Sequence, residues 1–190
     1  GAQISVSGAL NANGTRAQPV VFTSVADDGW GGDTNGDGGD SQPNPGDWNR
    51  IIVYGRASFE YAQVLYVSAT ANYGGIEASG GVVDFNNSTI AHTQYECVNA
   101  HNGGTFTARN SVFWDSSLGF GYYGSGKVAA YNCVFADMTV AVRQSGKILR
   151  NCVFYKCSED FVDQSGVNSS FENCLFFNPA GCGVQEFSKC

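Results

Sequence analysis

A repeat of about 22 residues constrains the fold of this chain more than any other feature of its sequence. Asn-Cys-Val-Phe occurs twice and close variants of it occur three times, beginning at Asn87, Asn110, Asn132, Asn151 and Asn173. A glycine column has a similar spacing, at Gly80, Gly103, Gly124, Gly146 and Gly166. So does an apolar column at Ile76, Val98, Phe120, Val142, Val162 and Val184. Three columns with one period indicate a solenoid in which each repeat forms one turn.

A unit of this length suits either a leucine-rich repeat or one coil of a β-helix. Leucine-rich repeats need a framework of Leu, and this sequence has only a handful of Leu residues. Each unit instead holds short alternating stretches, such as 141–144 and 152–155, that are separated by Gly, Asn or Ser. We therefore expect an all-β fold, with two or three strands per coil, that forms a single domain over residues 1–190.

Stacking of coils about 4.8 Å apart would place equivalent residues in ladders. The predicted inward aromatic stack is Ile90, Phe113, Phe135, Phe154 and Phe176. A ladder of small inward residues beside it would contain Ser88, Ser111, Cys133, Cys152 and Cys174. The Asn column is expected in a turn, where its amides bond along the stack. We interpret it as structural and not as a ligand site.

The Asn-Cys-Val-Phe units resemble the coils of right-handed parallel β-helix repeat proteins. The front of the chain is similar to the opening of secreted bacterial members of that group, of the cell-surface type. The segments that carry this likeness are 4–10, 19–24, the Asp-rich residues 27–47, and 46–52. The resemblance covers nearly the whole chain and implies a right-handed parallel β-helix in an extracellular protein. It leaves the role open, because such domains have many functions.

Charge and composition exclude several classes of partner. The net charge is −7, and no basic stripe suited to nucleic acid or to an anionic membrane surface occurs. No apolar run approaches the roughly 20 residues that span a bilayer. The chain begins with Gly and not Met, as a mature protein would after signal cleavage. Seven cysteines without a CxxC pair argue against zinc, and the odd count points to Cys190 as a free or interchain thiol.

Residues 27–47 form an acidic, glycine-rich segment. Within it, residues 33–38 match the first half of a D-x-N-x-D-G calcium loop, but Asn44 stands where the loop needs its bidentate Glu. We predict a structural calcium site that recruits further carboxylates, and the alternative is a plain exposed loop. The predicted ligands are Asp33, Asn35, Asp37, Asp40, Asp28 and Asp47, with Asp27 as a further candidate.

Two polar sets are candidates for chemistry or ligand binding. The first is an outward column of His92, Asp115, Asp137, Lys156 and Asn178. Asp115 and Asp137 would be stacked about 5 Å apart and form the best carboxylate pair, although a solvated edge is the simpler interpretation. The second is a candidate ligand face of Tyr123, Arg143, Asp163 and His101, with Glu77 and Asn99 beside them. We predict no enzyme activity for either set.

Strand alternation predicts an apolar outer face, because residues that flank an inward Cys or Phe point outward. Its members are Val112, Trp114, Val134, Val153, Tyr155, Leu175 and Phe177. A lid from the N-terminal segment, a neighbouring domain or another copy of the chain would cover such a face. The repeat still continues near the C-terminus, which suggests either a fragment of a longer surface protein or subunits that stack head to tail.

These observations favour a non-catalytic, extracellular, calcium-binding β-helix module for cell-surface structure, adhesion or self-assembly. Its expected partners are other copies of itself or neighbouring domains. The alternative is a carbohydrate-active protein that binds or cleaves acidic polysaccharide, either on the face of Tyr123, Arg143 and Asp163 or at Asp115 and Asp137.

Overall fold

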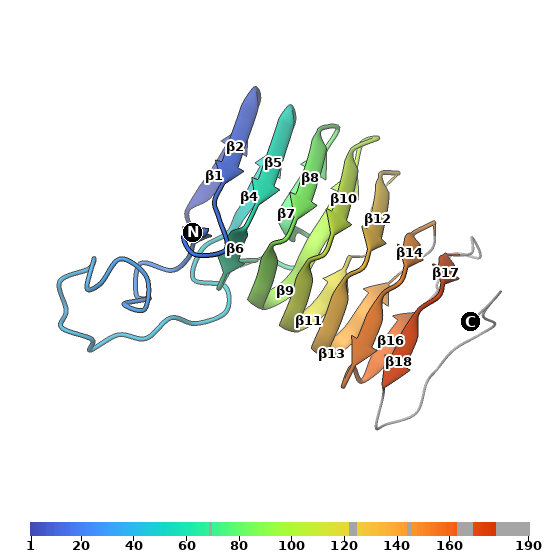
Figure 1. Cartoon of the computed structure of the whole chain (residues 1–190). Coiled ribbons are helices and arrows are strands. Elements are labelled where there is room, and N and C mark those ends of the chain that lie inside the picture. The colour runs from blue at the N-terminus through green and yellow to red at the C-terminus, as the bar shows by residue number, and fades with distance from the viewer. Residues whose placement is uncertain (69, 122–124, 144–145, 163–168, 178–190) are drawn as a thin grey trace.

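The computed structural model describes residues 1–68, 70–121, 125–143, 146–162 and 169–177, and within them it contains eighteen strands and no helix. The strands form a solenoid whose coils follow one another from the N-terminal to the C-terminal end (Figure 1). Every strand pairing is parallel, so each strand aligns with its equivalent in the next coil. The predicted all-β parallel β-helix is therefore confirmed.

One side of the solenoid, here called the first wall, is a seven-stranded sheet. Its strands, in spatial order, are β2 (Ala9–Asn13), β5 (Arg56–Glu60), β8 (Val82–Asn86), β10 (Thr105–Arg109), β12 (Lys127–Tyr131), β14 (Ile148–Arg150) and β17 (Ser170–Glu172). Inward and outward residues alternate along these strands, as in Lys127–Tyr131, where Val128 and Ala130 are buried. This alternation is what a sheet with one solvated face requires.

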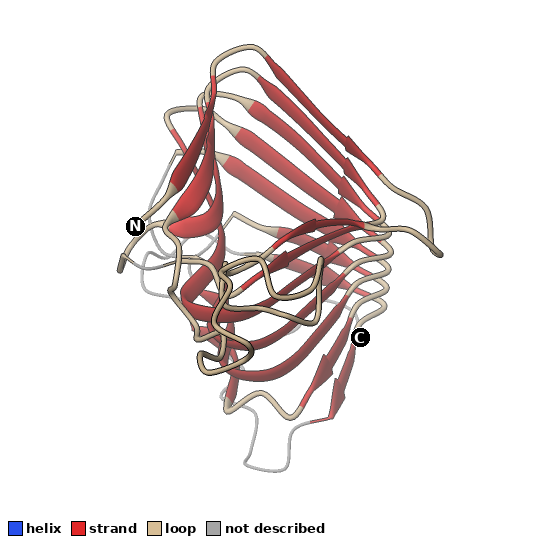
Figure 2. Cartoon of the chain, turned by 90° about the vertical axis from the view of Figure 1, so that its left-hand side faces the viewer, coloured by secondary structure: helices blue, strands red, loops and turns tan. Residues whose placement is uncertain are grey.

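The other two sides belong to one eleven-stranded sheet that bends. The second wall contains β3 (Val20–Phe22), β6 (Ala62–Leu65), the first parts of three long strands, β15 (Val153–Tyr155) and β18 (Leu175–Phe177). The third wall contains β1 (Gln3–Val6), β4 (Arg50–Val53), β7 (Gly74–Ser79), the second parts of the long strands and β16 (Glu159–Val162). The long strands that join the two walls are β9 (Thr89–His101), β11 (Val112–Phe120) and β13 (Val134–Arg143). Viewed from the N-terminal end, strands enclose the interior on three sides (Figure 2).

Left-handed backbone conformations form two of the corners. The Asn column lies between the first and second walls, with φ angles of 50–55° from Asn87 to Asn173. Asn132 donates to Asn110 at 3.2 Å, Asn151 to Asn132 at 3.1 Å, and Asn173 to Asn151 at 2.8 Å. Asn tolerates positive φ better than most residues, which explains the column. The prediction of a structural amide ladder is confirmed.

The corner between the second and third walls is a second column of positive φ, made by His92, Asp115, Asp137 and Lys156. Tyr66, with φ of 58°, begins this column one coil earlier. We call these five residues the corner column; Asn178, the last member predicted from the sequence, lies outside the described residues. The predicted glycine column forms the turns into the first wall, and Gly80, Gly103 and Gly146 have φ near 76°. Gly124 and Gly166 lie outside the described residues.

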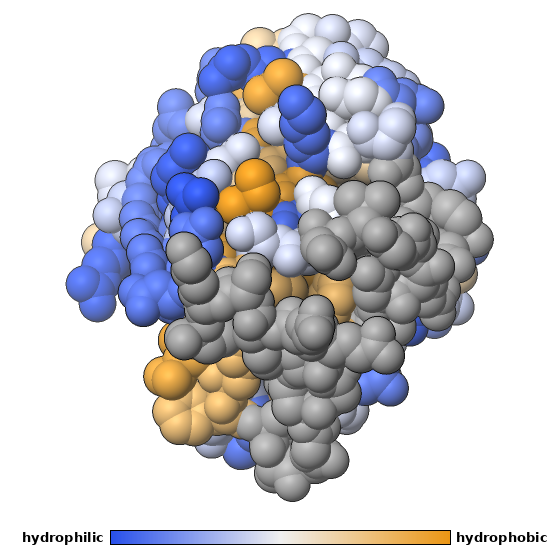
Figure 3. All heavy atoms as spheres, turned by 90° about the vertical axis from the view of Figure 1, so that its right-hand side faces the viewer, coloured by the Kyte–Doolittle hydropathy of each residue, from blue (hydrophilic) through white to orange (hydrophobic). Residues whose placement is uncertain are grey.

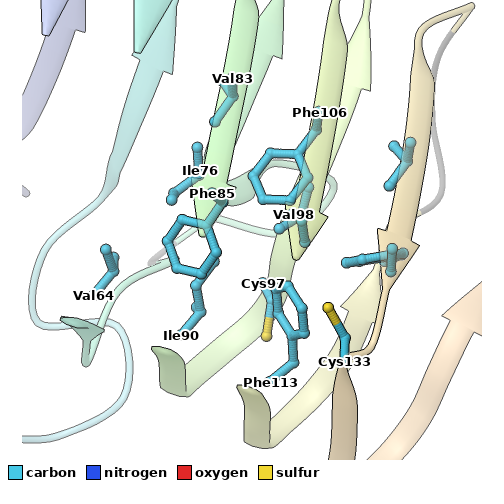
Figure 4. Packing of buried hydrophobic residues seen from close by; sticks show 14 of the residues in the cluster. Val64, Ile76, Val83, Phe85, Ile90, Cys97, Val98, Phe106, Phe113 and Cys133 are labelled. Carbon is cyan, nitrogen blue, oxygen red and sulfur yellow. The ribbon is translucent and has the colours of Figure 1, made fainter. Parts of the chain in front are cut away.

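The interior is filled by the predicted ladders. Phe113, Phe135, Phe154 and Phe176 stack with ring centroids 4.7–5.1 Å apart and interplanar angles of 7–13°. Ser111, Cys133 and Cys152 are about 1 % exposed beside them. Phe85 and Phe106 from the first wall and Ile76 and Val98 from the third wall point into the same core (Figure 4). One predicted member of the apolar column was wrong, because Val142 aligns with Phe161 and not with Val162. This coil is shorter than the others, and the same step of 19 residues separates Phe135 from Phe154.

The acidic segment is an excursion between β3 and β4 that projects away from the coils at the N-terminal end (Figure 1). Trp48 anchors its return: the indole is 7 % exposed, and its Nε1 donates to the carbonyl of Leu65 at 2.7 Å. The backbone N–H of Gly46 donates to the carbonyl of Tyr66 at 3.1 Å. The excursion therefore joins the second wall beside the start of the corner column.

Phe135→Ala tests the aromatic stack. The ring is fully buried and lies between Phe113 and Phe154, so its loss leaves a cavity that the stacked coils cannot close. We expect the free energy of unfolding, measured by urea denaturation, to fall by about 3–5 kcal/mol. Tyr54→Ala is the control, because that ring is 53 % exposed. Equal losses in the two variants would contradict the stacked core.

Candidate functional site

Three carboxylates of the acidic segment converge. One side-chain oxygen each from Asp28, Asp33 and Asp37 lies within 4.8 Å of the others. The turn that follows Asp33 explains the convergence, because its Oδ1 accepts from the backbone N–H of Asp37 at 3.0 Å and its Oδ2 from that of Gly38 at 2.9 Å. Gly36 and Gly38 have positive φ, which glycine adopts without strain. The arrangement is a candidate metal site.

Electrostatics within this acidic cluster favour a cation. Partial burial, followed by the charges of Asp33, Asp37 and Asp27, raises the pKa of Asp28 above its ordinary value. Asp28 Oδ1 is also buried without a hydrogen-bond partner among the described residues. The pKa of Asp37 is lowered, chiefly by the hydrogen bond from the Ser41 hydroxyl. A cation among the three carboxylates would satisfy the orphaned oxygen and relieve the repulsion, so these residues fit a hard metal ion.

The other predicted metal ligands are not members of the acidic cluster. Asn35 lies beside it and donates from Nδ2 to Asp37 Oδ2 at 2.8 Å. Asp47 accepts from the Ser24 hydroxyl at 2.5 Å and from the backbone N–H of Asn44 at 2.9 Å. Asp27 accepts from the Thr23 hydroxyl at 2.5 Å. Asp40 is exposed and lies outside the acidic cluster. Asp28 is the one member of the acidic cluster that comes from outside the D-x-N-x-D-G motif.

A groove of about 570 Å³ follows the corner column. Asp115, Asp137 and Lys156 line it together with the hydroxyls of Ser117, Thr139 and Ser158. Pro45, which belongs to the acidic segment, also lines the groove. Asp115 and Asp137 belong to successive coils, as predicted, and they stand side by side along one corner. Glycoside hydrolysis needs its two carboxyl groups on opposite sides of the scissile bond.

His92, in the coil before Asp115, is held by three side chains. Its ring stacks on Tyr66 with centroids 4.9 Å apart and meets Trp114 edge-on at 4.6 Å. Its Nδ1 lies 2.6 Å from Asp115 Oδ2. Burial, and then the charges of Asp27, Asp115 and Asp47, raises the pKa of Tyr66. Tyr66 was missed in the sequence because it breaks the polar pattern of the column, and only its spacing of 26 residues from His92 could have indicated it.

The candidate ligand face on the third wall is largely occupied by internal contacts. Glu77 is 1 % exposed and pairs with Arg50 at 2.7 Å and with His101. Asn99 is also buried, and its amide donates to Glu96 Oε2 at 3.1 Å. Arg143 is partly buried on this wall, whereas Tyr123 and Asp163 lie outside the described residues. Sequence reasoning missed Arg50, which lies 27 residues before Glu77 on the neighbouring strand β4, at a spacing that differs from the repeat.

The predicted apolar face exists as two columns on the second wall. Val112, Val134, Val153 and Leu175 align in one column. Trp114, Ala136, Tyr155 and Phe177 align in the other. We call these eight residues the apolar stripe. Exposure is 37 % at Trp114, 43 % at Tyr155 and 53 % at Phe177, whereas the equivalent residues of earlier coils, Leu65 and Ala91, are buried. Apolar surface also gathers at one lower corner of the C-terminal end (Figure 3).

The family comparison agrees with this architecture. The family model described as "Right handed beta helix region" matches residues 57–190. The chain belongs to this family. The match begins after the acidic segment, so it bears on the coils of the right-handed β-helix and not on the candidate metal site. Neither the search of curated proteins nor the search of solved structures gave a match.

The cysteines of this right-handed β-helix are core residues where they are described. Cys97, Cys133, Cys152 and Cys157 are buried thiols, and Cys174 is a partly buried one. Burial raises the pKa of Cys97 to about 12, which makes that thiol a poor nucleophile. Cys182 and Cys190 lie outside the described residues. No helix in the described part of the chain is long and apolar enough to cross a membrane.

Glu77→Gln tests whether the third-wall cluster is structural. The substitution removes the charge that Arg50 and His101 share, and it leaves the partly buried guanidinium without a counter-charge. We expect a loss of about 2–3 kcal/mol in the free energy of unfolding. The matched control is Asp84→Asn on the first wall, whose pair with Arg56 is exposed and should contribute under about 1 kcal/mol. Urea denaturation of both variants measures the difference, and a Glu77→Gln variant as stable as its control would contradict this role.

Proposed function

We propose that this chain is a non-catalytic, calcium-stabilised extracellular module that serves in surface structure, adhesion or self-assembly. The observation that carries the proposal is the convergence of Asp28, Asp33 and Asp37, one of which also has a buried oxygen without a hydrogen-bond partner among the described residues. Calcium is the ion of choice because it accepts carboxylate and carbonyl oxygens in flexible geometry, and glycine-rich turns provide both. The ion would stabilise the excursion next to the second wall.

The expected affinity of this site supports an extracellular location. Three carboxylates lack the bidentate Glu that completes a tight calcium loop. Sites of this kind belong to the weak range of extracellular modules, at roughly 10⁻⁴–10⁻³ M. Such a site would be occupied only where calcium reaches millimolar concentration. The resemblance of the front of the chain to secreted β-helix proteins supports the same location.

We propose that the chain is not catalytic because most of its candidate polar side chains are already engaged in internal hydrogen bonds. Glu77 bonds to His101 of the next coil, Asn99 donates to Glu96, and Asp115 is engaged by His92. The thiols described are inward. Asp137 and Lys156 remain exposed at the groove, which lies open along the corner and not between opposing walls.

Binding of an acidic polysaccharide at this groove is the second candidate. It is favoured by one arrangement: the Lys156 ammonium lies 5.0 Å from the centroid of the exposed Tyr155 ring, next to a line of hydroxyls. Aromatic faces and a cation suit the rings and carboxylates of such a chain. A glycan array separates the two candidates, since the first predicts that no polysaccharide binds at the corner column.

Calcium titration tests the first candidate. Calcium at millimolar concentration should raise the melting temperature by several degrees, because it binds only the folded loop. Asp33→Asn should lower the calcium affinity by at least tenfold in isothermal titration calorimetry, because it removes one of three anionic ligands. Asp40→Asn is the control and should leave the affinity within about twofold, since Asp40 lies outside the acidic cluster.

Two results would overturn this proposal. One is the absence of calcium uptake at millimolar ion, and the other is an equal effect of the two Asn substitutions. Release of reducing sugars or unsaturated products from any acidic polysaccharide would overturn the non-catalytic part separately.

A further inference from the structure

The order of residues along the apolar stripe is uneven. In the column nearer the corner, a large ring at Trp114 is followed by the small Ala136, and then by the rings of Tyr155 and Phe177. The flanking corner column changes sign, from Asp115 and Asp137 to Lys156. The two ends of this surface therefore differ along the solenoid axis. The small Ala136 and the acidic residues of the corner column lie nearer the N-terminal end than Tyr155 and Lys156 do.

We propose that a second copy of this chain packs on the apolar stripe, with the two solenoids antiparallel. The two-fold axis would lie in the interface, parallel to the strands, between the coils of β13 and β15. This inference rests on the proposed function in self-assembly and names the partner and the surface. This two-fold rotation keeps the strand direction and reverses the direction of the solenoid axis. Each corner column therefore faces the partner's corner column in reverse order.

Side-chain volumes are complementary under this operation. Ala136 of one copy lies opposite Tyr155 of the other, so a large ring faces a small residue at the centre, twice by symmetry. Trp114 lies opposite Phe177 at the two ends. In the second column Val134 faces Val153. The exposed rings are buried without two large groups meeting at the two-fold axis, which is what an isologous interface requires.

Charge is complementary under the same operation. Asp137 of one copy faces Lys156 of the other, and symmetry provides this pair twice. Both side chains are exposed in the single chain and lie at the rim of the apolar stripe. A two-fold axis along the solenoid would instead place the corner column against the neutral Asn column of the partner, with no charge paired. The residues therefore favour the antiparallel arrangement.

The apolar stripe is narrow, and this limits the affinity. Four coils spaced about 4.8 Å apart give a patch well below the area of a tight dimer interface. The pair is expected to be weak and concentration-dependent, with a dissociation constant on the order of 10–100 μM. Raised salt should weaken it further, because the charge pairs lie at the rim.

Charge reversal in the whole chain gives a sharp test by sedimentation equilibrium. Asp137→Lys places two lysines opposite each other, and Lys156→Asp does the same with two aspartates, so each variant should dimerise at least tenfold more weakly. An equimolar mixture of the two variants should form heterodimers at near the original affinity, because attraction is restored at both pairs. The backbone tolerates both changes, since Asp and Lys already occupy equivalent positions with positive φ in this column.

The controls keep a folding defect distinct from a lost interface. Ile148 lies on the first wall and is 40 % exposed, close to the 43 % of Tyr155. Ile148→Glu should therefore leave dimerisation unchanged. Tyr155→Glu should abolish dimerisation while the melting temperature stays close to that of the parent. Heterodimer rescue cannot occur if either charge variant is misfolded.

Three outcomes would overturn the antiparallel pair. They are a chain that stays monomeric up to about 1 mM, a dimer that is insensitive to both charge reversals, and a mixture that fails to recover. A monomer would leave the apolar stripe to a neighbouring domain or a glycan. Calcium uptake by the acidic cluster is measured separately, so failure of the pair and failure of the calcium-dependent module are distinguishable.

Discussion

Hydrogen bonding between successive coils is the constraint on which the rest of this structure depends. Because every pairing is parallel and nearly in register, a residue in one coil stacks on its equivalent in the next. The Phe stack, the amide ladder, the corner column and the apolar stripe are all consequences of this one alignment. A change in coil length is tolerated at turns, as in the coil of 19 residues between Phe135 and Phe154. It is also tolerated by a register shift within a long strand, as in the pairing of β9 with β11.

The same stacking determines where function can reside. The side chains of the inward columns are buried in the core, and the amides of the Asn column bond to one another along the stack. Neither set is available to a ligand. Outer features remain available, namely the acidic excursion, the groove at the corner column and the apolar stripe. They lie on or beside the second wall, because the excursion returns there through Trp48 and Gly46. An ion at Asp28 would thus order the end of the wall whose other end carries the stripe.

The coils could be predicted from the sequence because their ladders are local repeats. Asn132 and Asn151, or Phe135 and Phe154, reveal the period since each column needs one residue type for one physical reason. Contacts between coils of unequal length carry no such period. Arg50 meets Glu77 at a separation of 27 residues, longer than the repeat, and Tyr66 enters a polar column as an aromatic residue. All three carboxylates of the acidic cluster were among the predicted ligands. The motif names only Asp33 and Asp37, and it is the folding of the loop that brings Asp28 to them, and not Asp40 or Asp47. The displacement of Val162 by Phe161 arose because the short coil shifts the apolar column by one residue.

A crystal structure of the chain grown in millimolar calcium chloride, with anomalous scattering data, would decide whether the acidic cluster holds an ion. We expect an anomalous peak coordinated by Asp28, Asp33 and Asp37, with Asp28 Oδ1 as a ligand and with backbone or water oxygens completing six to eight contacts. We also expect the coils to keep the register described above. A loop whose three carboxylates point apart into solvent, with no ion between them, would contradict the proposed calcium site.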